Sequence, residues 1–366
     1  MCPAPGAMQL ESLDLRAVRQ ANIFCSSPFF LRHALVIISW LKSRGIPVTV
    51  WSEKDGPVGP ALEALALPEV RLRSWPQLPV SPRVSRPWSL VKTKLSFDRF
   101  CKASFQNAKG SLSFYEGDYP EPCLHALIVR CCRQHRVYKY GHGGHDTLPA
   151  SHVPPPIRFR ESLIAFSYGF PVTFFSRQEM PDSQFLPFFD SIRLGVQAIH
   201  IEVSDSVIGP MKSPIATIGD RPLLVFLDSA YEEETCVDYA DRLGVVLNTL
   251  DSLGWQIVAK GHPRLGSSKA MLRRLVPLLD VRLPLELFDL SNVRAVVGLC
   301  SSAMLSSASM GIPTYSLEQI IPRSDPQLSK SSIDFLKKAP GWSQSLIHIN
   351  FPQTHGDLPN PRAFAK

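Results

Sequence analysis

The chain has 366 residues, 45% of them hydrophobic and 19% charged, with a formal net charge of +7. This composition excludes a disordered or collagen-like chain, and the length favours two domains. The positive charge indicates an anionic partner, either a small substrate or a membrane surface. A nucleic-acid partner is not expected, because the Lys and Arg residues are scattered and no zinc-finger or helix-turn-helix signature is present.

The eight cysteines show no repeating spacing and no C-x-x-C pair. Neither a disulfide framework nor a structural zinc site is expected, and reduced thiols are typical of a cytoplasmic protein. The first residues lack the charged and apolar regions of a signal peptide. The longest apolar run near the start, 34–41, is too short to cross a bilayer. We therefore predict a cytoplasmic protein, with peripheral contact to the inner membrane face as an open alternative.

In chain order, short apolar runs alternate with helical patterns. Residues 21–25 and 48–51 predict strands on either side of a helix over 29–43, and 53–75 predict a further helix and strand. A helix is expected over 89–108, a strand over 111–115, a helix over 121–135 and a strand over 137–140. Helices over 162–175 and 186–196 follow, with a strand between them as an open alternative. A β–α–β start of this kind is typical of a doubly wound parallel sheet. No G-x-G-x-x-G follows the first strand, so a dinucleotide site is not expected there.

A polar segment with Pro and Gly, residues 204–222, interrupts this pattern and predicts a domain boundary after residue 205. The second half again predicts alternating elements. Strands are expected over 223–227, 255–259, 281–283, 294–298 and 312–315, and helices over 231–252, 269–279, 285–291 and 303–310, before a loop-rich tail. Two successive α/β domains, 1–205 and 206–366, predict a pair of Rossmann-like domains facing across a cleft, the layout called GT-B.

One candidate binding motif is the sequence Lys260-Gly261-His262-Pro263-Arg264, which follows a predicted strand. Ligands collect at this end of strands in open α/β sheets. A cation and an imidazole placed there can stabilise the charge that a phosphate gains as a nucleotide departs. Pro263 would fix the turn, and Gly261 would let a ligand approach the backbone. The alternative is a surface turn with solvated side chains.

A second motif is Ser301-Ser302, about forty residues later and at the start of a predicted helix. Hydroxyl and N–H groups at a helix start bind anions, although Ser is also a common N-cap. Between the two motifs, Glu286 on a short helix could accept hydrogen bonds from a ribose or base, or be a solvated carboxylate. Taken together, the motifs predict a nucleotide-phosphate site.

The C-terminal half, "IVAKGHPR … LPLELFDL … AVVGLCSSAMLSSASMGIPTYSL", resembles bacterial sialyltransferases of the polysialyltransferase and lipooligosaccharide-sialyltransferase group over residues 221–320. The resemblance implies a GT-B enzyme that uses CMP-sialic acid, inverts the anomeric carbon and needs no metal or other cofactor. A His-Pro pair and a Ser-Ser pair hold the CMP phosphate in that family. His262 and Pro263 match the first pair, and Ser301 and Ser302 match the second. The resemblance further implies that His262 assists departure of CMP and that Glu286 binds the nucleotide.

The family also implies a general base in an acidic-acidic-Gly motif after a strand of the N-terminal half. The best match is "SLSFYEGDYP", in which Glu116 and Gly117 take the last two places and Tyr115 replaces the first acid. Glu116 is the predicted base, with Asp118 in reserve, because partial burial can raise a carboxyl pKa toward neutrality. His142, in the loop GHGGHD at 141–146, is a further candidate. A solvated carboxylate and a merely flexible loop are the alternatives.

The leading hypothesis is an inverting glycosyltransferase that moves sialic acid, or a related keto-sugar, from a CMP donor to a cell-surface glycan. Its partners would be a nucleotide sugar and a glycan acceptor. Two alternatives stay open. One is a GT-B-shaped sugar-nucleotide epimerase or hydrolase, and the other is a catalytically inactive glycan-binding relative.

Overall fold

The computed structural model describes residues 8–75, 87–105, 110–116, 136–140, 146–148, 155–156, 159, 173–176, 186–188, 197–201, 203, 205–216, 220–338 and 349–364. The chain divides into two compact units, Cys2–Ile208 and Gly209–Lys366. The boundary predicted after residue 205 falls within the short helix α6 (Asp205–Ile208), and the structural division comes at the end of that helix.

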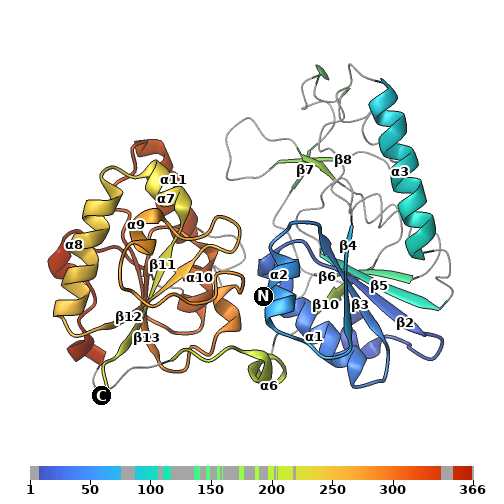
Figure 1. Cartoon of the computed structure of the whole chain (residues 1–366), viewed down its shortest axis with the longest axis horizontal. Coiled ribbons are helices and arrows are strands. Elements are labelled where there is room, and N and C mark those ends of the chain that lie inside the picture. Colours follow the sequence, from blue (N-terminus) through green and yellow to red (C-terminus); the bar gives the residue numbers. More distant parts are fainter. Residues whose placement is uncertain are drawn as a thin grey trace. The chain divides into compact units, whose positions relative to one another are not determined.

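The N-terminal unit is built on a seven-stranded sheet in which every pairing is parallel, with the order β1-β10-β6-β5-β2-β3-β4. Its strands are β1 (Met8–Gln9), β2 (Gln20–Phe24), β3 (Val48–Glu53), β4 (Val70–Trp75), β5 (Ser111–Glu116), β6 (Arg136–Tyr140) and β10 (Gln197–His200). Strand β5 is buried along its whole length, as expected for a strand covered on both faces. Three helices follow the first strands: α1 (Leu31–Lys42), α2 (Val58–Ala64) and α3 (Pro87–Phe105) (Figure 1).

A small antiparallel sheet also belongs to this unit and was not predicted. It pairs β7 (Asp146–Leu148), β8 (Thr173–Ser176) and β9 (Leu186–Phe188). The helices predicted over 162–175 and 186–196 are therefore wrong where β8 and β9 lie. The sequence Thr-Phe-Phe-Ser of β8 contains the β-branched and aromatic residues that favour a pleated strand over a helix.

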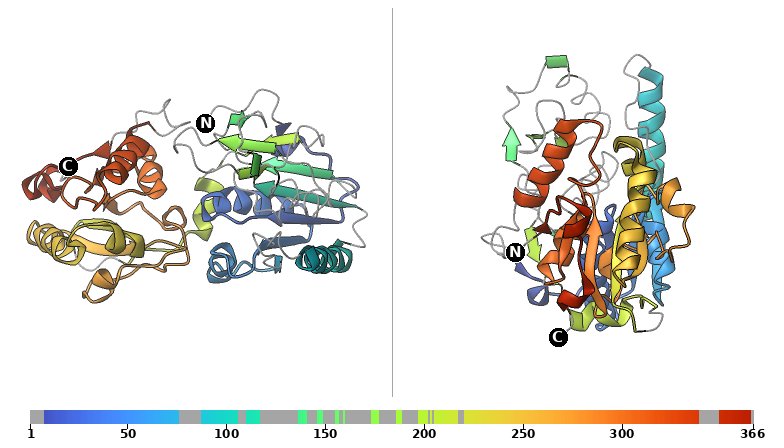
Figure 2. Two further views of the ribbon diagram at one scale, coloured as in Figure 1. Left: turned by 90° about the horizontal axis from the view of Figure 1, so that it is seen from above. Right: turned by 90° about the vertical axis from the view of Figure 1, so that its left-hand side faces the viewer.

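The C-terminal unit contains a five-stranded parallel sheet with the order β12-β11-β13-β14-β15. The strands are β11 (Leu223–Asp228), β12 (Gln256–Gly261), β13 (Val293–Gly298), β14 (Thr314–Ser316) and β15 (Ile349–Asn350). Its helices include α8 (Tyr239–Ser252), α10 (Ser302–Ser309) and α11 (Pro326–Lys338). Helices α8 and α11 lie on opposite sides of the sheet (Figure 2). The core is formed mainly by β11, β12, β13 and the apolar face of α8.

Two predicted helices of this unit are shorter in the structure. The helix expected over 231–252 is divided into α7 (Ala230–Thr235) and α8, because Cys236 is extended and Asp238 has a left-handed backbone with φ of 48°. The helix expected over 269–279 stops after α9 (Lys269–Leu272), and residues 277–279 instead pair with the edge strand β12 through Ala259. The strand expected over 281–283 is absent from this fully described stretch.

Parallel sheets with helical connections in both units confirm the predicted fold class, α/β with two Rossmann-like domains. Their predicted arrangement across a cleft stays a prediction. Among the described residues, no helix is both long and apolar enough to cross a membrane. Cys25, Cys236 and Cys300 are free thiols.

Candidate active site

The strand order of the C-terminal sheet reverses between β11 and β13, and this reversal identifies a candidate binding region at the carboxyl edge. The chain passes from β11 to β12 on one side, and then from β13 to β15 on the other. In open α/β sheets, ligands bind in the crevice where the strand order reverses in this way. Strand β11 ends there at Asp228, and β13 is followed there by residues 299–301. Because neighbouring strands are about 4.8 Å apart, the ends of β12 and β13 lie about 10 Å apart across β11.

His262 is the first residue after β12 and has one defined tautomer. Its Nδ1 accepts hydrogen bonds from the backbone N–H groups of Arg264, at 3.1 Å, and Leu265, at 3.2 Å. An Nδ1 that accepts cannot carry a proton, so the neutral ring must carry it on Nε2. Burial lowers the pKa of His262, and the nearby charges of Lys260 and Arg264 lower it further. At neutral pH His262 is therefore an uncharged ring whose Nε2–H is available to donate.

The loop that carries His262 is fixed from several directions. The backbone groups of His262 and Gly266 pair with each other at 3.2 and 2.8 Å. Asp228, at the end of β11, accepts a hydrogen bond from the N–H of Ser268 at 2.7 Å, and the Glu233 carboxylate accepts one from the backbone N–H of Lys269 at 2.6 Å. Sequence reasoning missed Asp228 as a positioning residue. Its signal was a single acid that ends the otherwise apolar strand Leu-Leu-Val-Phe-Leu-Asp.

Lys260 and Gly261 lie within β12 rather than after it, which differs from the prediction. The Lys260 ammonium is buried and donates to the backbone carbonyls of Gly261 and Val281, the latter at 3.2 Å. Burial lowers the pKa of Lys260 to about 8, opposed by the charges of Glu286 and Asp280. A Cβ at Gly261 would clash with the Ser267 hydroxyl. The space at Gly261 that was predicted to admit a ligand is thus occupied by Ser267 of the same loop.

Ser301 and Ser302 form the start of α10, as predicted. Ser301 is the N-cap, and its hydroxyl accepts from the N–H of Ala303 at 3.2 Å, whereas Ser302 is exposed in the first turn. Glu286 lies in a buried 3-10 turn, Leu285–Leu287, that packs against α10. Ser301 and Ser302 therefore lie at the carboxyl edge that also carries His262 and the half-buried Pro263, and Glu286 lies in a turn that packs against the helix they begin.

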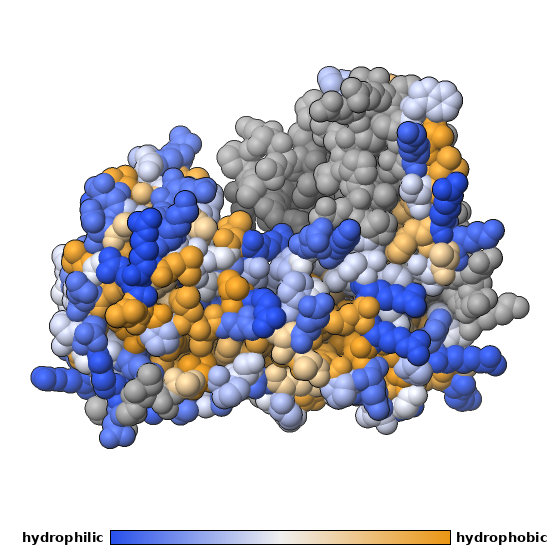
Figure 3. Space-filling view, in the orientation of Figure 1, coloured by the Kyte–Doolittle hydropathy of each residue, from blue (hydrophilic) through white to orange (hydrophobic). Residues whose placement is uncertain are grey.

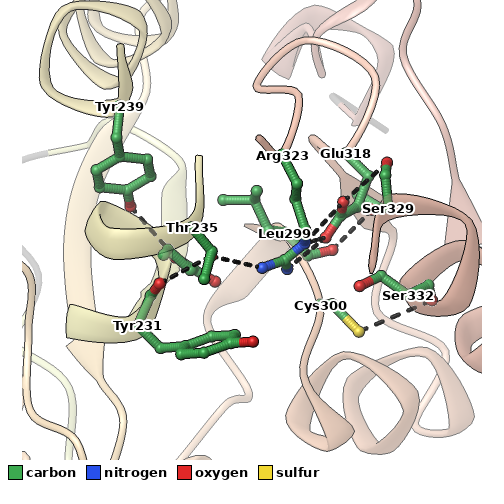
Figure 4. A network of polar contacts seen from close by, with 11 residues as sticks. Tyr231, Thr235, Tyr239, Leu299, Cys300, Glu318, Arg323, Ser329 and Ser332 are labelled. Carbon is green, nitrogen blue, oxygen red and sulfur yellow. Dashed lines mark hydrogen bonds and ion pairs between the residues drawn. The ribbon is translucent and has the colours of Figure 1, made fainter. Parts of the chain in front are cut away.

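A buried ion pair lies beside this edge and was not predicted (Figure 4). The Arg323 guanidinium binds the Glu318 carboxylate through Nε at 2.9 Å and Nη2 at 2.5 Å, and both side chains are almost completely buried. Arg323 also donates to the Thr235 hydroxyl at 3.0 Å and lies 5.9 Å from the centre of the Tyr231 ring. These contacts connect the segment after β14 to α7, which begins at the end of β11.

Two further acids share the Tyr239 hydroxyl, and one of them, Glu232, is within electrostatic reach of Arg323. The Tyr239 hydroxyl bonds to Asp228 at 2.8 Å and to Glu232 at 3.2 Å. Burial, followed by the charge of Asp228, raises the pKa of Glu232 to about 8, although Arg323 opposes this shift. Glu232 is therefore mostly protonated at neutral pH. Among the described residues, no three His, Cys, Asp or Glu side chains are arranged to hold a metal ion.

In the N-terminal sheet, the order reverses between β2 and β5, and Glu116 ends β5 at that point. Its side chain is completely buried. It accepts a short hydrogen bond from the Ser26 hydroxyl and bonds from the N–H of Ser27 at 3.0 and 3.1 Å. Burial raises the pKa of Glu116 to about 7, and the hydrogen bonds from Ser26 and Ser27 oppose the increase. Its location and raised pKa match what a general base requires, but its exposure does not.

Several predicted residues lie outside the described part of the chain. They are the alternative base His142, its loop neighbours 141–145, and Gly117 and Asp118 beside Glu116. Ser26 and Ser27, which bind Glu116, were not singled out from the sequence. They follow the first strand, 90 residues before Glu116, so only the strand pairing β2–β5 reveals the contact.

No family model matches the chain, and no curated protein matches it. Solved structures are similar to it at low identity. The glycosyltransferase of kitacinnamycin is 11% identical, with 94% of this chain and 89% of that chain covered and a TM-score of 0.45. The calicheamicin glycosyltransferase CalG4 is 12% identical, with 94% and 89% covered and a TM-score of 0.41. The UDP-GlcNAc 2-epimerase from Neisseria meningitidis is 13% identical, with 93% and 94% covered and a TM-score of 0.42. At these low scores, the fold rests on the chain's own two sheets.

Proposed function

We propose that the chain is an inverting glycosyltransferase of GT-B type that transfers sialic acid, or a related keto-sugar, from a CMP donor to a glycan. One observation carries the proposal: the neutral His262 ring directs a fixed Nε2–H donor from the carboxyl edge that also bears the start of α10. A hydrogen-bond donor and a helix start at a reversal of strand order together suit a phosphate.

In the proposed reaction, the bond between the anomeric carbon and the phosphate oxygen breaks, and the phosphate gains negative charge. The Nε2–H of His262 donates to that oxygen, and the N–H of Ser302 with the hydroxyls of Ser301 and Ser302 binds the other phosphate oxygens. Glu286 would bind the ribose or base, and Lys260 and Pro263 would hold the loop in place. The acceptor hydroxyl forms the new bond to the anomeric carbon and gives its proton to Glu116. No metal or other cofactor is part of this proposal.

The donor class is tested by thermal unfolding of the full chain in the presence of CMP, CDP, UDP, GDP and ADP. A ligand that binds only the folded state stabilises it by about 2.7 kcal/mol at one hundred times its Kd. We expect CMP to raise the Tm most. A rise with UDP alone would instead support the epimerase, and no rise with any nucleotide would support the inactive glycan-binding relative.

The base is tested by Glu116→Gln together with a pH profile. Since the folded-state pKa of Glu116 is about 7, transfer by the wild type should increase as pH rises through 7, when the carboxylate forms. The variant should lose most transfer and this pH dependence. If Glu116→Gln keeps full transfer, the base lies elsewhere, and His142→Ala becomes the next variant to measure.

The same substitution has a distinct effect on stability. A carboxyl pKa raised from 4.5 to about 7 means that the folded state holds a proton that the unfolded chain has lost. In the wild type this contribution to stability is therefore present below pH 4.5 and is lost as pH rises to about 7. In Glu116→Gln, the free energy of unfolding should decrease less between pH 4.5 and about 7 than it does in the wild type. A stable but inactive variant thus separates a chemical role from a structural one.

A sugar-nucleotide hydrolase or epimerase is the second candidate, and the complete burial of Glu116 favours it. An acceptor hydroxyl can reach this carboxylate only if Ser26 moves aside, because Ser26 and Ser27 already occupy its oxygens. A reaction without a glycan acceptor needs no such movement. Release of free sugar from the donor at an unchanged rate with and without added glycan would support this candidate.

A further inference from the structure

One surface of the C-terminal unit exposes several large apolar side chains. It comprises residues 264–282, called here the 264–282 surface, and its exposed apolar members are Leu265, Leu272, Leu275, Leu278 and Val281. Leu275 is fully exposed. Scattered single leucines on a surface are ordinary, but exposed apolar side chains that gather into a patch are typical of interaction sites.

This surface is held in a defined conformation. Residues 277–279 add to the edge of the sheet, because the N–H of Ala259 donates to Pro277 at 2.8 Å and the N–H of Leu279 donates to Ala259 at 2.8 Å. Arg274 turns inward and donates to the carbonyl of Ala240 at 3.1 Å. Met271 is buried in the core, so α9 is anchored while the neighbouring Leu272 is exposed. The leucines are thus presented by a fixed backbone beside the loop of His262.

Within this segment the charge is mostly positive, although the Glu233 carboxylate of α7 lies against the backbone N–H of Lys269. Its basic residues are Arg264, Lys269, Arg273, Arg274 and Arg282, and its single acid is Asp280. Asp280 is already paired with Arg282 at 2.6 Å. Arg264, Lys269 and Arg273 are exposed. Figure 3, in the orientation of Figure 1, shows hydrophobic residues beside strongly hydrophilic ones on the C-terminal unit.

We propose that the 264–282 surface docks on an anionic lipid bilayer, with its leucines in the acyl boundary and its cations at the headgroups. Apolar side chains surrounded by Lys and Arg are the composition that binds this interface. Charge favours an anionic bilayer over a second copy of the chain as the partner of this surface, since two copies would bring like charges together. Docking here would place the His262 loop close to the membrane surface, where lipid-linked or membrane-bound acceptors are found.

The experiment is co-sedimentation of the full chain with phosphatidylcholine vesicles, with and without phosphatidylglycerol. We expect binding only when phosphatidylglycerol is present, and weaker binding as salt increases. Each basic residue near the surface contributes a factor of about five, so Lys269→Ala with Arg273→Ala should weaken binding by about 25-fold. Leu275→Asp should weaken it by at least about tenfold, because the leucine that would insert into the bilayer is replaced by a charged side chain.

The matched control is Val245→Asp, since Val245 is an exposed apolar residue on α8 of the same unit. It should bind vesicles like the wild type, and all variants should keep the wild-type Tm because the replaced side chains are exposed. Equal binding to vesicles without phosphatidylglycerol, or unchanged binding by Leu275→Asp, overturns the proposal. So does a wild-type dimer in light scattering that Leu275→Asp dissociates, because a second copy would then cover this surface.

Discussion

Replacing His262 by alanine should lower donor turnover by about 10²- to 10⁴-fold, the range expected when a positioned proton donor is lost. The reason is the fixed Nε2–H, which His262 can present because Arg264 and Leu265 hold its Nδ1 as an acceptor. The effect should appear in kcat more than in KM, since the phosphate charge develops as the bond breaks. Turnover is measured as release of the nucleotide from the sugar donor.

Two companion variants define the cause of that loss. His262→Gln keeps a side-chain N–H donor and should recover part of the rate. His355→Ala removes an exposed histidine from the same unit and should leave the rate unchanged. If His262→Ala turns over the donor like the wild type, the proposed mechanism is wrong. Burial lowers the pKa of His262, so the ring should be neutral at every pH above the ordinary pKa of histidine. The pH profile should therefore show no step near 7 that comes from His262.

The candidate site residues that sequence reasoning located all carry local signals. A His-Pro pair after a strand and a Ser pair at a helix start each follow from a few neighbouring residues. Asp228 and Arg323 behave differently, because their partners Ser268 and Glu318 become partners only through the folded loops. The tautomer of His262 likewise depends on a turn geometry that its sequence does not specify.

The same distinction explains the fold. Buried parallel strands such as β11 are continuous apolar runs, and the predicted bounds of β11 and β13 agree with the structure to within a residue. The helix pattern over 269–279 failed because residues 277–279 form backbone hydrogen bonds with the edge of β12, and Pro277 cannot donate in a helix. The break between α7 and α8 depends on Cys236, whose backbone pairs with Arg323 far along the chain. Pairings that are distant in sequence override local periodicity at each of these places.

Replacing Arg323 by alanine should destabilise the C-terminal unit by about 3–5 kcal/mol, because it leaves the fully buried Glu318 without its cation. The loss should be larger than for an exposed ion pair, since both side chains are almost completely buried and water cannot replace the guanidinium. The free energy of unfolding is measured by chemical denaturation at neutral pH. Arg282→Ala, which breaks the more exposed pair with Asp280, is the control and should cost about 1 kcal/mol or less.

A second variant separates charge from packing at this position. Arg323→Met with Glu318→Leu removes both charges and keeps similar volume, so it should recover most of the stability that Arg323→Ala loses. Thr235 then loses one hydrogen bond from Arg323, which limits the recovery by about 1 kcal/mol. If the double variant is as unstable as Arg323→Ala, the guanidinium acts mainly through its connection of Thr235 in α7 to the segment after β14. In that case the contact with Thr235, and not the neutralisation of Glu318, would hold the end of β11 in place. Asp228, which fixes the His262 loop, lies at that end.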